Sequence, residues 1–187
     1  LCVEPNDMYW YRLAHRKCII AAAFVGGKDD MQPIHVSLDN GVFGGIVGEE
    51  FDNKKGKTEK RYTVSLNTVF EQFAVPHDID YMSLDVEGAE ELIMKDFPFD
   101  SYKMKFMTIE RPRPSLQALL KEHGYVFVMK LVYWGDTLWV HEDVIKNGFV
   151  SEEIQTITHS NSEWSKKEPK KNDEVFDFET GTYERMK

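Results

Sequence analysis

The sequence predicts an α/β fold with a mostly parallel, doubly wound β-sheet. The first observation is a short apolar run, Ile79 to Leu84, followed by acids, by Gly88 and then by the helix-forming stretch Ala89 to Lys95. The second is the apolar run Cys18 to Val25, whose lack of alternation is typical of a strand buried on both faces of a parallel sheet. Ligands of such folds bind outside the carboxyl ends of the strands, so we look for a site there.

Asp85 and Glu87 follow directly after the central strand. Residues two apart on extended backbone point to the same side, and two carboxylates there repel unless a cation, a proton or a donor separates them. The pair is therefore suited to bind a metal ion, to act as a general base or to accept hydrogen bonds from a ligand. The spacing is equally compatible with one of them capping the helix that follows.

Two further predicted strands are each followed directly by an acidic residue. Glu4 follows Leu1 to Val3, and Glu110 follows Met104 to Ile109. If these strands are parallel, the acids share one rim of the sheet. Glu4 can also be read as a surface acid before a turn, and Arg111 as a residue that neutralises Glu110.

Composition narrows the class of protein. The chain has 187 residues, 42% of them hydrophobic and 13% aromatic, which predicts a folded domain with a substantial core. A net charge of -9 argues against nucleic-acid binding. We recognise no signal peptide, and no apolar stretch has the roughly 20 residues needed to span a bilayer. Cys2 and Cys18 lie in apolar runs, and we expect buried free thiols, with a disulfide between them as the alternative. Two cysteines are too few to indicate an oxidising or a reducing compartment, and no Cys or His cluster has zinc spacing.

The remaining segments are assigned by turn and capping signals. Residues 1–147 are expected to form the domain, and residues 148–187 a charged C-terminal tail that is partly disordered or docks as an arm. The elements expected within the domain are a helix from Asn6 or Asp7 to Arg16, a hairpin or irregular insert over 34–47, a basic loop over 53–61, a strand over 62–66, a helix over 68–73 capped by Asn67, a helix over 114–123 ended by Gly124, and an antiparallel hairpin of 125–133 with 137–140.

The motif Asp85-Val86-Glu87-Gly88-Ala89-Glu90 after an apolar strand resembles the hallmark of the FkbM-type methyltransferases, with Ser83-Leu84 before it closer to the eukaryotic branch. Three other segments resemble the same family in the expected order, and the likeness runs from Leu1 to about Val144. They are Leu1 to Asn6, Met107 to Glu110, and Asp136 to His141. The resemblance implies a class I methyltransferase fold, Rossmann-like and with a reversed C-terminal hairpin.

The resemblance also implies S-adenosylmethionine as cofactor and a small-molecule or glycan-like hydroxyl as acceptor. It would place Glu4 on the cofactor ribose, with Pro5 and Asn6 beside it, and Ala22 against the adenine, although the asparagine that the family often carries there is missing. Asp85 would lie nearest the transferred methyl and also contact the cofactor. The carboxylate of Glu87 would support Asp85 or the acceptor hydroxyl, and Glu110 would border the acceptor pocket.

The chain departs from the family where it would hold the methionine end of the cofactor, because it lacks the first strand and its glycine-rich loop. We therefore expect a fragment that binds S-adenosylmethionine weakly or not at all. One alternative is a noncatalytic interaction module with the same fold. Another is a hydrolase in which Asp85, Glu87 and Glu110 hold magnesium or calcium.

Overall fold

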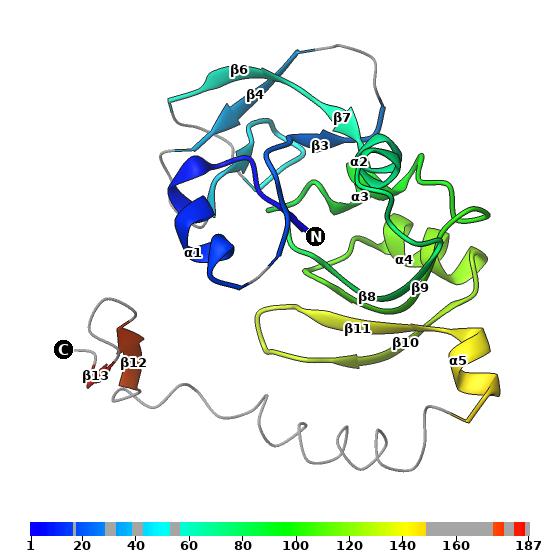
Figure 1. Ribbon diagram of the computed structural model, residues 1–187. Coiled ribbons are helices and arrows are strands. Elements are labelled where there is room, and N and C mark those ends of the chain that lie inside the picture. The colour runs from blue at the N-terminus through cyan, green and yellow to red at the C-terminus, as the bar shows by residue number, and fades with distance from the viewer. Residues whose placement is uncertain are drawn as a thin grey trace.

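The computed structural model describes residues 1–16, 18–28, 33–38, 43–52 and 57–148, together with the backbone of 174–177 and 182–185 (Figure 1). These parts form a mixed α/β structure. Among them, no helix has both the length and the apolar character needed to cross a membrane.

The largest sheet has four strands in the order β10-β11-β9-β8. β8 (Asp78–Leu84) and β9 (Lys103–Ile109) are parallel, with Leu84 opposite Ile109. β10 (Tyr125–Lys130) and β11 (Thr137–His141) form an antiparallel hairpin that joins the sheet through β11 and β9. The predicted central strand, its parallel neighbour and the C-terminal hairpin are thus confirmed. β8 is an edge of this sheet, with no strand of the described chain paired to its other side.

The main core lies between this sheet and three helices. The helices are α2 (Leu66–Gln72), α3 (Glu90–Met94) and α4 (Pro114–Glu122). Met94, Met104, Met107, Leu116 and Trp139 are all fully buried in it. Pro114 begins α4 and Gly124, at φ 81°, follows its end, as predicted from their types.

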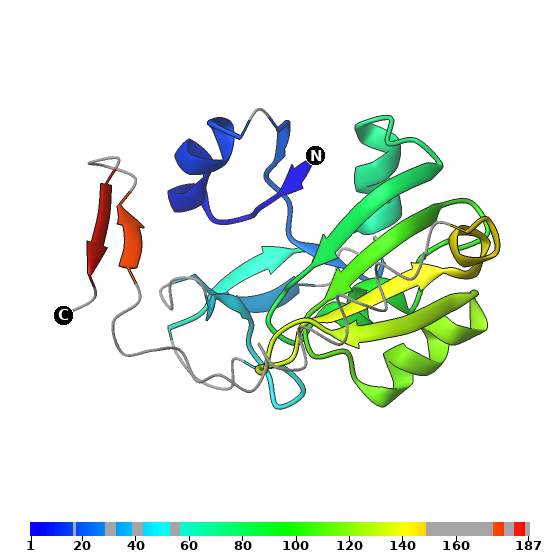
Figure 2. The same ribbon diagram turned by 90° about the horizontal axis from the view of Figure 1, so that it is seen from below.

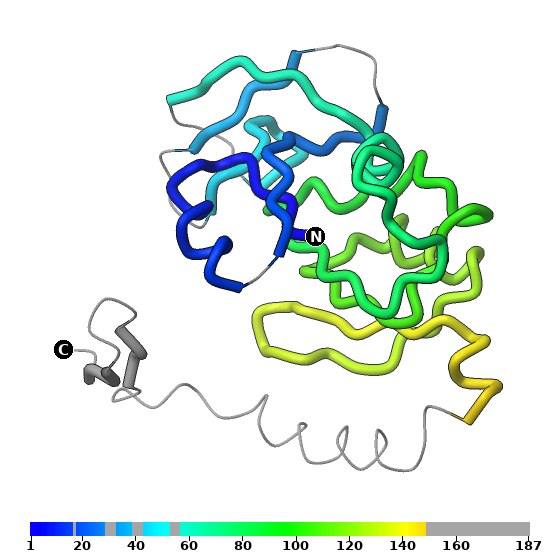
Figure 3. Tube along the Cα trace, in the orientation of Figure 1, coloured from blue at the N-terminus to red at the C-terminus, as the bar shows by residue number. Residues whose placement is uncertain are grey.

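Shorter strands form the N-terminal half (Figure 3, blue to cyan). β1 (Cys2–Val3) pairs in parallel with β2 (Ile20–Ala21), and β3 (Val25–Gly26) pairs in parallel with β7 (Val64–Ser65). A three-stranded antiparallel sheet has the order β5-β4-β6. Its strands are β4 (Pro33–Ser37), β5 (Gly45–Ile46) and β6 (Glu59–Tyr62).

Several expectations for this half were wrong. The apolar run Cys18 to Val25 is not one strand, because the chain leaves β2 after Ala21 and enters a different sheet at Val25. The cap of α2 is Ser65, whose hydroxyl accepts a hydrogen bond from the Thr68 amide at 3.0 Å, so the helix starts before Asn67. The segment expected to be a basic loop also ends inside β6.

Three further helical elements complete the described chain. They are η1 (Asp7–Tyr9), α1 (Trp10–Ala14) and α5 (Glu142–Lys146). Asn6 caps η1 by accepting a hydrogen bond from the Met8 amide, as the sequence predicts. Beyond α5 the structure describes only the backbone hairpin of β12 (Glu174–Asp177) and β13 (Thr182–Arg185). Most of the expected tail lies outside the described residues, so the domain division stays a prediction.

Cys2 and Cys18 form a disulfide, so the expectation of free thiols was wrong. The reason is the register of the first two strands. Cys2 lies opposite Ile20 and its amide donates to the Ile19 carbonyl at 2.8 Å, which brings the backbone just before β2 beside β1. Cys18 therefore lies in the connection ahead of the strand, with its Cα 6.0 Å from that of Cys2.

Replacing both cysteines by alanine should lower the free energy of unfolding by about 3 kcal/mol, the loop-closure contribution expected for a crosslink of this span. Urea unfolding of the double variant and of the native chain measures the difference. The native chain treated with reductant should match the variant. Equal unfolding curves in all three samples, together with two titratable thiols in the native chain, would contradict the crosslink.

Candidate functional site

The candidate site forms where β8 and β9 end. Because the two strands are parallel and Leu84 pairs with Ile109, the next residues, Asp85 and Glu110, emerge side by side. The Glu110 amide donates to the Leu84 carbonyl at 3.0 Å, which extends the pairing by one residue. Carboxylate oxygens of Asp85, Glu87 and Glu110 all lie within 4.8 Å of one another. We call these three residues the carboxylate cluster.

Glu87 reaches the cluster by a tight turn and not along extended backbone. β8 ends at Leu84, and Glu87 and Gly88 both adopt left-handed conformations, with φ 54° and 94°. A Cβ at residue 88 would stand 3.0 Å from the backbone nitrogen of Asp52, so glycine suits this position both by conformation and by space. The spacing of Asp85 and Glu87 correctly predicted that their side chains lie together, but the extended backbone assumed between them was wrong.

The helix after the turn is not capped by either of these acids. The N-cap of α3 is Ala89, and its side chain makes no capping bond. Instead, the buried Glu90 carboxylate accepts hydrogen bonds from the Val86 amide at 3.1 Å and the Gly88 amide at 3.3 Å. Glu90 thereby holds the turn, which leaves Asp85 and Glu87 available for other contacts.

Arg111 brings positive charge to the cluster. One terminal nitrogen of its guanidinium lies 2.9 Å from Glu110, 3.5 Å from Glu87 and 2.7 Å from Asp52. The Glu87 and Glu110 side chains are only 14% and 13% exposed, so this pairing offsets much of the repulsion between two poorly hydrated anions. The sequence suggested that Arg111 neutralises Glu110, and the structure confirms that contact.

Asp85 differs from the other two acids because it is poised to hold a proton. Partial burial, a hydrogen bond with Glu110 and the charges of Glu110, Glu87 and Asp136 raise the pKa of Asp85 to about 7. One oxygen of Glu110, Oε2, is buried and, when both groups are ionised, has no donor among the described residues. A proton on Asp85 can be donated in the hydrogen bond that joins Asp85 to Glu110.

Glu4 lies on a separate sheet, at the end of β1. Figures 1 and 2 show β1, β8 and β9 running toward the same side of the molecule. One Glu4 carboxylate oxygen accepts a hydrogen bond from the Asn6 amide at 2.7 Å, while partial burial raises the pKa of Glu4. Pro5 is half-buried, Asn6 is buried, and Ala22 is exposed just beyond β2. No measured contact joins Glu4, Pro5, Asn6 or Ala22 to the carboxylate cluster.

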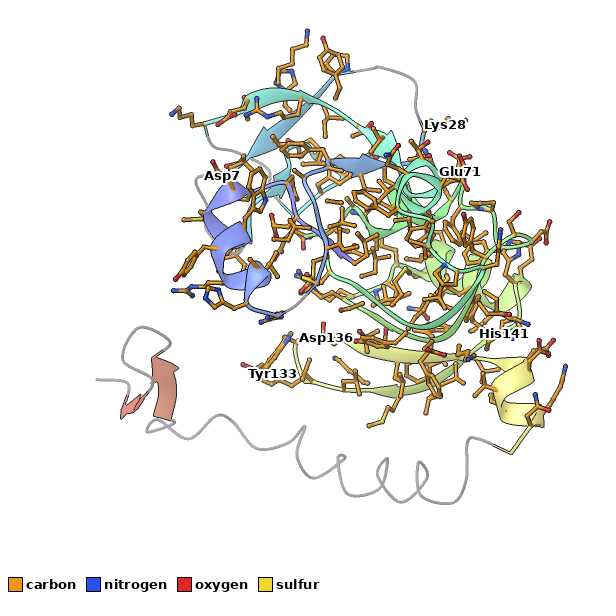
Figure 4. The ribbon with its side chains drawn as sticks, viewed as in Figure 1. Asp7, Lys28, Glu71, Tyr133, Asp136 and His141 are labelled. Atoms are coloured by element: carbon orange, nitrogen blue, oxygen red, sulfur yellow. A yellow bond between two sulfur atoms is a disulfide. The ribbon has the colours of Figure 1, made fainter. Side chains whose placement is uncertain are left out.

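Sequence reasoning missed Asp52 and Asp136. Asp52 precedes β6, and its amide donates to the Glu87 carbonyl at 3.3 Å. Asp136 lies in the turn between β10 and β11, as labelled in Figure 4, where its charge acts on Asp85. Asp52 is distant from the cluster in sequence, and no local pattern marks it. Asp136 had a usable signal, because it belongs to a tight-turn sequence ahead of a predicted strand.

Two other features limit what the site can be. The cluster's oxygens are close enough for one cation to meet all three, but the Arg111 guanidinium already contacts Glu87 and Glu110, so we assign no metal site. A surface hollow of about 270 Å³ is lined by Lys28, Ser65, Asn67 and neighbours, and shares no residue with the cluster. The carboxylate cluster remains the best candidate site by its chemistry.

Open α/β sheets bind their ligands outside the carboxyl ends of the strands, and the acids of the carboxylate cluster lie at such an edge. The model of the methyltransferase FkbM domain matches residues 1–127, about two thirds of the sequence, and the chain belongs to this family. The family implies a methyltransferase with a class I methyltransferase fold. The match includes β8, β9 and the whole carboxylate cluster. No curated protein and no solved structure matches the chain.

The raised pKa of Asp85 predicts a pH-dependent stability. Between its ordinary pKa of 3.8 and about 7, the native state binds more protons than the unfolded state, so the group lowers stability as pH rises. Asp85→Asn removes this effect. At pH 8 the variant should be more stable than the native chain by roughly 1 kcal/mol, a value discounted because the side chain is exposed to solvent.

Urea unfolding of both proteins at pH 8 and at pH 4 checks this expectation. At pH 4 Asp85 is largely protonated in the native chain, so the advantage of the variant should nearly disappear. A difference of the same size at both pH values would show that the substitution acts through packing and not through charge.

Proposed function

We propose that the chain is an S-adenosylmethionine-dependent methyltransferase that acts on a hydroxyl group of a small molecule or glycan-like acceptor. The observation that carries this proposal is the carboxylate cluster, in which a hydrogen bond joins Asp85 to Glu110 at the carboxyl edge of the sheet of an FkbM methyltransferase domain. The class I arrangement of the whole domain, Rossmann-like and doubly wound, is part of the same proposal.

The acids at the strand ends suit a cofactor that carries a sulfonium ion and a ribose. When bound, S-adenosylmethionine supplies a methyl group on a positively charged sulfur, which keeps the bonding electrons as an acceptor oxygen takes the methyl. The Glu4 carboxylate, held at its strand end by the Asn6 amide, would accept hydrogen bonds from the ribose hydroxyls. Pro5 and Asn6 would shape this corner, and the exposed Ala22 would leave room for the adenine.

The chain's own part in catalysis would be positioning and proton acceptance. Asp85 lies where its ionised form can accept the proton of a hydroxyl, and a group with a pKa of about 7 is well matched to that task near neutral pH. Glu110, the hydrogen-bond partner of Asp85, would border the acceptor pocket. Glu87 would orient Asp85 or the acceptor hydroxyl from the neighbouring turn. Most of the rate gain would come from holding the acceptor in line with the methyl.

Binding of S-adenosylhomocysteine, the demethylated product, tests the cofactor assignment. At millimolar concentrations we expect amide shifts in the NMR spectrum at residues 3, 4 and 6, near Ala22 and at 84–88. Glu4→Gln should weaken binding about tenfold, because it removes a charged acceptor. Glu71→Gln, the same change on a different part of the molecule (Figure 4), should leave it unaltered.

The absence of shifts at this edge in a protein that carries the whole methyltransferase domain, glycine-rich loop included, would contradict the cofactor assignment. It would favour a noncatalytic interaction module with the same fold. Weak binding would still support the assignment if the shifts lie at the named residues and depend on Glu4.

In an enzyme that carries the whole methyltransferase domain, Asp85→Ala should lower turnover at least tenfold, a loss in the lower range for removal of a positioned general base. The measurement is the release of S-adenosylhomocysteine in the presence of a panel of hydroxyl-bearing small molecules and oligosaccharides. Glu71→Gln again serves as the control and should retain native turnover. Unchanged turnover in Asp85→Ala would remove this residue from the mechanism.

A further inference from the structure

Arg111 has features that a residue serving only to neutralise a neighbouring acid would not need. Its backbone is left-handed, with φ 39°, which is unfavourable for an arginine. Its amide donates to the Gly135 carbonyl at 3.2 Å. The Arg111 side chain passes so close to Gly135 that a Cβ at residue 135 would overlap its Cγ. The β10–β11 turn thus holds Arg111 by both its backbone and its side chain.

The guanidinium joins three parts of the chain that are far apart in sequence. It meets Glu87 after β8, Glu110 after β9, and Asp52 at the end of the segment 48–52 that follows β5. The same segment is fixed at two further points. The Asp52 amide donates to the Glu87 carbonyl, and the Arg113 guanidinium donates to the Glu50 carbonyl. Segment 48–52 therefore packs against the carboxylate cluster.

We propose that Arg111 is a positioning residue, which fixes Glu87 and Glu110 in one arrangement around Asp85 and clamps segment 48–52 against them. It performs two tasks through one guanidinium. Its charge favours the ionised form of Glu87 beside Glu110, and one of its terminal nitrogens contacts Asp52, Glu87 and Glu110, which ties the segment to both strand ends. Arg113 performs only the second task, because it contacts the segment through a backbone carbonyl.

The inference deepens the proposed function and rests on it in one respect, since the arrangement matters to methyl transfer only if the cluster is the reaction site. The arrangement itself does not depend on that. The groups that face Arg111 are Asp52, Glu87 and Glu110. Burial and the charge of Glu110 raise the pKa of Glu87, with smaller contributions from Asp52 and Glu90, and the charge of Arg111 offsets part of that rise. A titration of the cluster therefore reports on Arg111 without cofactor or acceptor.

The test compares Arg111→Met, Arg111→Lys and the matched control Arg113→Met. Carbon-13 NMR of labelled carboxyl groups follows Glu87 against pH, and amide hydrogen exchange follows residues 48–52. In Arg111→Met the pKa of Glu87 should rise by about one unit, and the segment should exchange faster. In Arg111→Lys the charge is kept, so the titration should stay near native, while the segment still exchanges faster. In Arg113→Met only the exchange should change.

Two results would overturn the proposal. One is a Glu87 titration that is unaltered in Arg111→Met, and the other is an equal shift in Arg113→Met, which would trace the effect to the segment and not to the guanidinium. Should Arg111→Met fail to fold, native exchange of the segment in Arg111→Lys would refute the clamp. If the clamp is correct and only the proposed function is wrong, the titrations would follow the expected pattern while S-adenosylhomocysteine produced no shifts.

Discussion

The parallel pairing of β8 with β9 is the constraint on which the site depends. Their register sets Leu84 opposite Ile109, so the first residues beyond each strand are carboxylic acids that must face each other. A shift of one residue would turn one of them to the other face of the sheet. The register is secured by the buried side chains of Met104, Met107 and Ile109. Core packing and site chemistry are therefore fixed by the same pair of strands.

Bringing several acids together is unfavourable, and the structure offsets it in three ways. Glu90 is buried but accepts two backbone hydrogen bonds, so its charge is stabilised locally. Glu87 and Glu110 share the guanidinium of Arg111. No cation among the described residues pairs with Asp85, and it holds a proton at a pH where an ordinary aspartate would not. A pKa near neutral pH is well matched to a group that, once ionised, accepts a proton from a hydroxyl.

The sequence was sufficient where short-range patterns determine structure. Uninterrupted apolar runs predicted β8 and β9, and the acids directly after these runs predicted Asp85 and Glu110 as site residues. It was insufficient where partners are remote in the chain. Nothing near Asp52 indicates that it will meet Arg111, and the disulfide depends on the pairing of β1 with β2, which composition does not encode. The split between β2 and β3 was missed because an apolar run has the same appearance whether it serves one sheet or two.

The unpaired edge of β8 has a consequence for handling the protein. β8 is seven residues long, and alternate residues at this edge present amide and carbonyl groups that pair with no strand of the described chain, while Tyr81 is 55% exposed on the same strand. Open strand edges of this length act as templates for intermolecular pairing, which natural proteins usually block with prolines, bulges or charges. Asp78 and Asp80 supply two such charges, the second of them paired with Lys105 at 2.6 Å, so self-association should increase in concentrated salt solutions, where charge repulsion is screened.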